Sequence, residues 1–139
     1  MSAKNILLAD DDFEDKSIIQ DAMEMLNAAD VMFFANSGLH AWELLEKCYT
    51  DNTIPCLIVL DLNMPKMSGA QMLGKIKNDI RFKDVPVIIY STSINPLEKE
   101  KCLSLGAHAY IAKPVSFNES LETAKTFLGF CRSERTAKQ

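Results

Sequence analysis

The sequence predicts an α/β protein built on a doubly wound parallel sheet, one layer of strands with helices on both faces. Short unbroken apolar runs, such as Ile6-Leu7-Leu8-Ala9 and Leu57-Ile58-Val59-Leu60, are typical of strands buried on both faces. Segments with helical periodicity alternate with these runs, and the connections are brief. Five such strand–helix units imply right-handed crossovers and helices on both sides of one sheet. The 139 residues fit a single domain, with its core over about residues 4–131.

In the first half of the chain we expect strands over residues 5–9, 31–35 and 56–60, and helices over 13–28 and 37–49. Apolar residues at helical spacing indicate the first helix: Ile18, Ile19, Ala22, Met23 and Leu26. The second helix has a similar inner side, made of Leu39, Trp42, Leu44 and Leu45. A polar, turn-rich loop over residues 50–55 then leads into the third strand.

In the second half, a helix over residues 68–79 follows the Met64-Pro65-Lys66 turn. Strands are expected over 85–90 and 109–112, and the helix between them should begin with Pro96 and end near Gly106, a helix-stop residue. A last helix is predicted over 117–130, and residues 132–139 read as a polar, frayed tail.

Composition excludes several classes of protein. A net charge of −4 offers no electrostatic reason for nucleic acid or an anionic membrane to be the main partner. No apolar stretch approaches the roughly 18 residues of a spanning helix, and the first strand starts too early to leave room for a signal peptide. The four cysteines form no Cys-x-x-Cys pair, so we expect reduced thiols in a cytoplasmic protein rather than a disulfide or zinc site.

Polar residues follow four of the apolar runs directly. They are the triplet Asp10-Asp11-Asp12, Asp61, the pair Ser91-Thr92, and Lys113. Each group would lie at the carboxyl end of its strand, which is the edge where open α/β sheets bind ligands. We therefore expect acids, hydroxyls and an ammonium to converge on one crevice.

Each of these residues also has a purely structural interpretation. Asp12 can cap the first helix, with Asp15 three residues on, but adjacent carboxylates at Asp10 and Asp11 repel each other unless a cation lies between them. With Asp61 they form a hard oxygen site of the kind that Mg²⁺ occupies, and an ionised carboxylate is also a nucleophile toward phosphorus. Lys113 could be a solvated surface charge, or it could balance the acids and bind a phosphoryl oxygen.

The smaller polar groups at this edge are more ambiguous. Hydroxyls such as those of Ser91 and Thr92 commonly cap the next helix. An aromatic residue in a strand, such as Tyr110, usually only packs in the core.

These motifs, taken in order, closely resemble the receiver domain of two-component response regulators, of the chemotaxis-protein (CheY-like), stand-alone type. The matching segments are Leu8-Ala9-Asp10-Asp11, Leu60-Asp61-Leu62-Asn63-Met64-Pro65 with Gly69, Ser91-Thr92, Gly106-Ala107 and Lys113-Pro114. The resemblance covers residues 4–131 and implies the flavodoxin-like (βα)₅ fold, with strand order 2-1-3-4-5.

The resemblance implies a role for each matching position. Asp61 corresponds to the aspartate that accepts a phosphoryl group from a phosphohistidine of a sensor histidine kinase or phosphotransfer protein. The implied Mg²⁺ (or Mn²⁺) ligands are Asp11 directly, Asp10 through water, Asp61, and the backbone carbonyl of Asn63. Ser91, Thr92 and Lys113 would bind phosphoryl oxygens.

The resemblance also implies a switch. Ser91 would move toward the phosphoryl group and Tyr110 would turn inward, changing the face made by the fourth helix, fifth strand and fifth helix. Asn63 and Ser93 match positions that tune dephosphorylation, and Pro114 would follow a cis peptide bond. A downstream protein would bind that face, and a phosphorylation-dependent dimer is compatible with it. The short polar tail leaves no room for an output domain, so a stand-alone receiver is expected.

Two departures from the family pattern and two rival functions remain open at this point. The triplet allows a one-residue error in assigning metal ligands, and the loop over residues 49–55 is longer than in the shortest family members. A binding module that works without phosphorylation would keep the fold but not the switch. A hydrolase of the haloacid dehalogenase type would need Asp-x-Asp at the nucleophile, whereas Asp61-Leu62-Asn63 lacks the second acid.

Overall fold

A parallel sheet of five strands forms the centre of the molecule. The computed structural model describes the backbone of residues 6–64, 67–92 and 94–137, and their side chains as far as Cys131. The strand order is β2-β1-β3-β4-β5, which confirms the flavodoxin-like prediction. The strands are β1 (Ile6–Ala9), β2 (Met32–Ala35), β3 (Leu57–Asp61), β4 (Val87–Ser91) and β5 (Ala109–Ala112).

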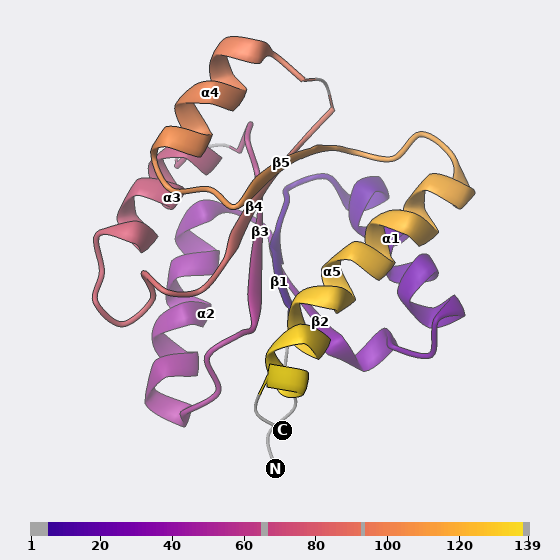
Figure 1. Ribbon diagram of the computed structural model, residues 1–139, viewed down its shortest axis with the longest axis horizontal. Coiled ribbons are helices and arrows are strands. Elements are labelled where there is room, and N and C mark those ends of the chain that lie inside the picture. Colours follow the sequence, from indigo (N-terminus) through magenta and orange to yellow (C-terminus); the bar gives the residue numbers. More distant parts are fainter. Residues whose placement is uncertain (1–5, 65–66, 93, 138–139) are drawn as a thin grey trace.

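Helices cover both faces of this sheet. They are α1 (Phe13–Met25), α2 (Gly38–Asp51), α3 (Gly69–Lys77), α4 (Pro96–Ser104) and α5 (Phe117–Ala137), with a short 3₁₀ turn η1 (Ala29–Val31) after α1. With the sheet seen nearly edge-on, α1 and α5 lie on one side of it and α2, α3 and α4 on the other (Figure 1).

The central strands are apolar throughout because each has two buried faces. In β1, Leu7 and Ala9 pack in the core under α2, α3 and α4, whereas Ile6 and Leu8 pack in the core under α1 and α5. The alternation follows from the two-residue side-chain period of a strand. Both cores need apolar side chains, so the strand shows no alternation of polar and apolar residues.

Several element boundaries differ from the sequence predictions. Helix α1 ends at Met25, because Asn27 takes a left-handed conformation (φ 58°) and the chain then turns through η1. Helix α2 continues to Asp51 and is ended by Asn52, also left-handed (φ 61°), so the loop expected over 50–55 begins only there. Asparagine tolerates this conformation better than most residues, but this tendency does not identify the turn beforehand.

The inner sides of α1 and α2 are also narrower than predicted. Ile18 and Leu39 were assigned to them, yet their side chains are 39% and 46% exposed. The residues of α2 that are fully buried are small or central ones, Gly38, Ala41 and Leu45.

The C-terminal tail is helical over most of its length. Helix α5 continues to Ala137, so the prediction of a frayed tail from residue 132 is wrong for the backbone up to that point. The segment contains neither glycine nor proline, and its residues can extend a helix in water once the preceding turns are formed.

The prediction of four reduced thiols is wrong for one pair. Cys56, just before β3, and Cys131 of α5 are joined by a disulfide, with their Cα atoms 5.4 Å apart. They are 75 residues apart in the sequence, and only the packing of α5 against the sheet brings them together. Cys48 and Cys102 are free cysteines, as expected. Among the described residues, no helix combines the length and apolar character needed to cross a membrane.

Candidate functional site

The strand register brings the predicted site residues to one edge of the sheet. Ala9 pairs with Leu60, so Asp10 and Asp61 leave adjacent strands at the same level. On the other side of β3, Asp61 pairs with Tyr90, and Ser91 pairs with Ala112, the residue before Lys113. The backbone N–H of Lys113 donates to the Ser91 carbonyl at 2.6 Å, which continues this register into the site.

The three residues of the acidic triplet have two different roles, one at the start of α1 and one in the crevice. Asp12 is the N-cap of α1, and its side chain accepts a hydrogen bond from the Asp15 N–H at 3.0 Å. The Asp12 N–H in turn donates to Asp10 Oδ1 at 2.9 Å, which turns the chain from strand to helix. Asp12 therefore has the capping role that the sequence suggested, and Asp10 and Asp11 are left for the crevice.

Asp10, Asp11 and Asp61 offer carboxylate oxygens that all lie within 4.8 Å of one another. Asp10 is fully buried and Asp61 is 5% exposed, whereas Asp11 is exposed. The buried Oδ2 of Asp10 lies 3.0 Å from the Lys113 ammonium as an ion pair, but it accepts no well-aligned hydrogen bond. Like charges so close together, with a buried oxygen in need of a partner, fit a divalent cation with hard oxygen ligands.

Lys113 is the cation of this crevice and is itself only 8% exposed. Its Nζ lies 2.6 Å from Asp15 Oδ2, 3.0 Å from Asp10 Oδ2 and 3.3 Å from Asp61 Oδ2. Burial by itself lowers the pKa of Lys113, but the hydrogen bond to Asp15 and the negative charges of Asp10 and Asp61 outweigh it and raise the pKa above its usual value. The ammonium is therefore charged at any physiological pH.

The protonation of the neighbouring groups also reflects burial. Burial raises the pKa of Asp10 to about 6, although its hydrogen bond from the Asp12 N–H and the charge of Lys113 oppose the shift. Burial likewise raises the pKa of Tyr90, whose ring lies 5.6 Å from Lys113 Nζ. Tyr90 is thus a neutral phenol that forms part of the floor of the site.

The remaining predicted residues are dispersed around these charges. Ser91 is buried at the end of β4, whereas Thr92 is exposed. The Asn63 side chain is exposed, and its backbone N–H donates to Asp61 Oδ1 at 3.2 Å. Ser93 and Pro65 lie outside the described residues.

Tyr110 lies on the neighbouring strand to Ser91 and points into the protein. It pairs with Ile89 of β4 and is only 6% exposed, in the core under α2, α3 and α4. Since Ser91 is two residues beyond Ile89, its side chain lies on the same face of the sheet. The inward position of Tyr110 is therefore the one this structure adopts.

The expected cis peptide bond at Pro114 is not found. The described residues contain no cis peptide bond, so the Lys113–Pro114 bond is trans. The trans form is favoured by about 0.5–1 kcal/mol for bonds to proline in general. With this bond trans, Lys113 still reaches all three of its carboxylate partners.

Sequence reasoning missed Asp15 as a member of the site. It was noted only as a neighbour of the cap, yet it makes the shortest contact of Lys113. The available signal was its position in the first turn of α1, because a helix that follows β1 begins at the same edge of the sheet. A second acid one turn after Asp11 therefore faces the crevice.

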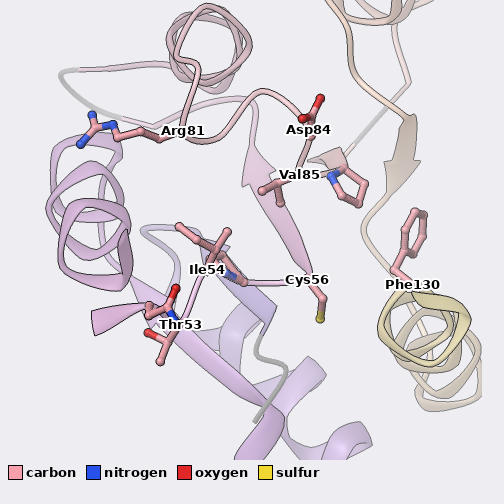
Figure 2. A pocket seen from close by; sticks show the side chains of 10 residues that line it. Thr53, Ile54, Cys56, Arg81, Asp84, Val85 and Phe130 are labelled. Atoms are coloured by element: carbon pink, nitrogen blue, oxygen red, sulfur yellow. The ribbon is translucent and has the colours of Figure 1, made fainter. Parts of the chain in front are cut away.

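A sizeable pocket lies away from this edge. A pocket of about 540 Å³ opens at the other end of the sheet, where β3 and β4 begin. Figure 2 shows Phe130 of α5 at one side of it and Arg81 at the other, with Ile54, Val85 and Cys56 between them. None of the predicted site residues lines it.

Comparisons with known proteins agree with the geometry of the acidic crevice. Residues 6–125 match the family model of the response regulator receiver domain. The chemotaxis protein CheY1 of Helicobacter pylori is 32% identical over 124 residues, which cover 89% of this chain and 96% of that protein. The two-component response regulator ARR17 of Arabidopsis thaliana is 31% identical, covering 93% of this chain and 87% of that protein.

Solved structures give the same result. The phosphorylated cyanobacterial phytochrome response regulator RcpA superimposes with a TM-score of 0.81 and 30% identity, over 93% of this chain and 94% of that one. The Mn²⁺-bound form of response regulator Rcp1 has a TM-score of 0.76 and 27% identity, over 91% and 93% of the two chains. Members of this family are signalling domains rather than classical enzymes, bind a divalent metal at an acidic pocket, and interact with sensor kinases and downstream targets. The chain belongs to the response regulator receiver family and acts in two-component phosphorelay signalling.

Proposed function

We propose that Asp61 is the phosphoacceptor of this receiver, and that the phosphoryl group comes from a phosphohistidine of a sensor kinase or a phosphotransfer protein. The observation that carries the proposal is the placement of Asp61 at the end of β3, within 4.8 Å of two further carboxylates and 3.3 Å from the Lys113 ammonium. Phosphoryl transfer depends mainly on positioning and charge neutralisation, and these groups supply both.

Asp11 and Asp61 would hold Mg²⁺ directly, Asp10 through water, and the Asn63 carbonyl would complete the protein ligands. The bound cation would neutralise charge on the phosphoryl oxygens. Asp61 attacks phosphorus in line, the bond to the histidine nitrogen breaks, and that nitrogen leaves with the bonding electron pair. Lys113 then pairs with one phosphoryl oxygen, and the Ser91 hydroxyl donates to another, with Thr92 at the rim.

Loss of the phosphoryl group would be a property of the same site. Water attacks the acyl phosphate from the open side of the crevice, where the exposed Asn63 side chain and Ser93 would adjust its access. This slow self-dephosphorylation would limit the lifetime of the signal.

The donor protein would dock beside the crevice rather than in it. Exposed apolar side chains of α1, of the loop after β5 and of the first residue of α5 flank the site: Phe13 (77% exposed), Ile18 (39%), Val115 (88%) and Phe117 (47%). The loop residues follow Lys113 directly, and Phe13 follows the acidic triplet. An apolar surface next to a reactive group favours a protein partner.

The signal would leave through the face made by α4, β5 and α5. When Ser91 moves toward the phosphoryl group, the packing next to it on β4 changes, and Tyr110 lies on the adjacent strand of the same face. Phosphorylation would thus shift an equilibrium between two positions of Tyr110, and with it the binding of a downstream protein or a second copy of the chain.

The test is to incubate the protein with acetyl phosphate and Mg²⁺ and to measure its intact mass. We expect an adduct of one phosphoryl group that is absent from Asp61→Asn and absent when the metal is chelated. An adduct of equal size on Asp61→Asn would move the acceptor elsewhere. No adduct on the wild type, together with no binding of beryllofluoride, would place the protein among phosphorylation-independent binding modules.

A further inference from the structure

Three carboxylates surround the Lys113 ammonium, and this arrangement has a consequence for phosphoryl binding. Asp15 Oδ2 accepts a hydrogen bond from Lys113 Nζ at 2.6 Å, and Asp10 Oδ2 and Asp61 Oδ2 lie 3.0 Å and 3.3 Å from it as ion pairs. The phosphoryl oxygen that Lys113 is to bind therefore competes with these carboxylates for the ammonium. The carboxylate that stays closest to Lys113 determines how tightly the lysine binds the phosphoryl group.

Two of the three carboxylates attract Lys113 less strongly once the site holds a cation and a phosphoryl group. Asp61 becomes the acyl phosphate itself, so the donor that faced its carboxylate can turn to a phosphoryl oxygen. Asp10 belongs to the set of acids that fits the metal, and a cation there compensates its charge. Asp15 is outside that set, so a cation there compensates its charge less directly.

Asp15 also makes the closest contact with the ammonium. Its distance of 2.6 Å is the shortest of the three, and its side chain is 24% exposed, so much of the attraction acts away from bulk water. Its backbone is fixed in the first turn of α1 by the hydrogen bond of its N–H to the Asp12 cap. The carboxylate is thus held on the α1 side of the crevice by a rigid element.

We propose that Asp15 is a positioning residue that retains the Lys113 ammonium on the α1 side and so competes with the phosphoryl group for it. Its charge acts in the same direction, because a carboxylate beside Lys113 repels an incoming phosphoryl group of about −1.5 to −2 charge. Asp15 therefore weakens the phosphorylated state relative to the free state. The proposal rests on the proposed function of Asp61 and Lys113.

The experiment compares Asp15→Asn with Glu14→Gln, titrating each with beryllofluoride at saturating Mg²⁺. Glu14 is the neighbouring acid in the same helical turn, is exposed, and is joined to Lys113 by none of the ion pairs of the described residues. Both variants remove one negative charge. We expect Asp15→Asn to bind the phosphoryl mimic about three- to tenfold more tightly than wild type, and Glu14→Gln to differ by less than about twofold.

A second measurement uses the metal-free protein and does not depend on phosphoryl chemistry. Thermal unfolding in the presence of a chelator is compared for wild type, Asp15→Asn, Lys113→Met and the double variant. The effect of Asp15→Asn should be largely lost in the Lys113→Met background, since the pair is then already broken. If the effects of Asp15→Asn and Lys113→Met were additive, the contact between the two residues would not contribute to stability, and the proposal would be overturned.

The outcomes separate the two claims. If the wild type fails to bind beryllofluoride, the proposed function fails and this inference fails with it. If the wild type binds it but Asp15→Asn binds equally or more weakly, or Glu14→Gln tightens binding as much as Asp15→Asn, then the proposed function stands and the role of Asp15 is overturned.

Discussion

Each end of the central sheet has a lysine that is at least partly buried, and the two lysines have different surroundings. At the carboxyl ends of the strands, Lys113 lies among three carboxylates, and the pKa of the ammonium is raised. Toward the amino ends, Lys77 donates to the backbone carbonyls of Lys83 at 2.9 Å and Val85 at 2.8 Å, and burial lowers its pKa. The Lys77 ammonium joins two backbone carbonyls of one loop, whereas the single positive charge of Lys113 faces three carboxylates.

The other residues at the two ends of the sheet differ in the same way. The carboxyl end buries Asp10, Asp61 and Ser91, groups that cost stability unless they are paired. The amino end has the disulfide of Cys56 and Cys131 and a pocket lined by both polar and apolar side chains, shown in Figure 2. The comparison indicates that the carboxyl end is organised for binding and chemistry, and that the amino end contributes stability. Four experiments test this division, from the largest expected effect to the smallest.

Removing the disulfide should cost the most stability and leave the chemistry intact. Replacing Cys56 and Cys131 by serine should lower the free energy of unfolding by about 2–4 kcal/mol, because the bond closes a long loop in the unfolded chain. Urea unfolding monitored by circular dichroism measures this. Cys48→Ser, at a free and partly exposed cysteine, is the control and should change stability by less than about 0.5 kcal/mol. A large loss of acyl phosphate formation in the double variant would contradict the division between the two ends.

Neutralising one of the proposed metal ligands should instead weaken metal binding and leave stability intact. Asp11→Asn should weaken Mg²⁺ binding about 10- to 100-fold, measured by calorimetric titration, because it removes a carboxylate oxygen from the set of three. Without metal, its stability should not fall, since one like charge is gone. The control is Asp12→Ser, which retains a capping side chain and should keep its Mg²⁺ affinity. If Asp12→Ser lost affinity instead, the ligand assignment would be wrong by one residue.

Gly69 links the site to the packing of α3. A Cβ at this position would lie 2.5 Å from the Asp61 carbonyl oxygen and 2.9 Å from the Leu62 Cα, so the backbone that carries Asp61 would have to move. Gly69→Ala should cost about 1–3 kcal/mol and also reduce the yield of acyl phosphate. Gly74→Ala, in the same helix with open space around it, should instead stabilise the protein by about 0.5–1 kcal/mol. Equal stability of the two variants would show that the close approach is not required.

The smallest effect is expected at the start of α3. Ser68 and Gln71 form a capping box, in which each side chain accepts a hydrogen bond from the other residue's backbone N–H. Ser68→Ala should lower the free energy of unfolding by about 1 kcal/mol. Ser68→Asp should retain most of the stabilisation, because aspartate can also cap the helix. Chemical denaturation distinguishes these variants. Unchanged stability in Ser68→Ala would mean that water replaces the cap without loss.

Much of the site could be predicted before the structure because the relevant signals are local. A strand buried on both faces is apolar throughout, and the first polar residue after it marks the carboxyl edge of a parallel sheet. This argument located Asp10, Asp61, Ser91 and Lys113, and the observed register places all four at one edge. The cap at Asp12 was also predictable, since capping depends on the next three residues only.

What failed depended on contacts between distant segments or on conformations of similar energy. The disulfide joins residues 75 positions apart, and no spacing rule indicates that α5 packs beside the start of β3. The end of α1 and the length of α2 depend on single asparagines in left-handed conformations, which differ little in free energy from a continued helix. The trans bond at Pro114 is a third case, because the two isomers are close in free energy.

The sequence by itself determined the sheet, its edge of polar groups, and the lysine and three of the acids that meet there. Only the tertiary structure added Asp15, the acid closest to the lysine, because that contact depends on where the first turn of α1 lies relative to the end of β5. Asp15 and Lys113 are 98 residues apart, and their contact at 2.6 Å arises from the packing of α1 beside the sheet. Local sequence patterns specify secondary structure and the direction of side chains, whereas the distance between two charges is set by the packing of whole elements.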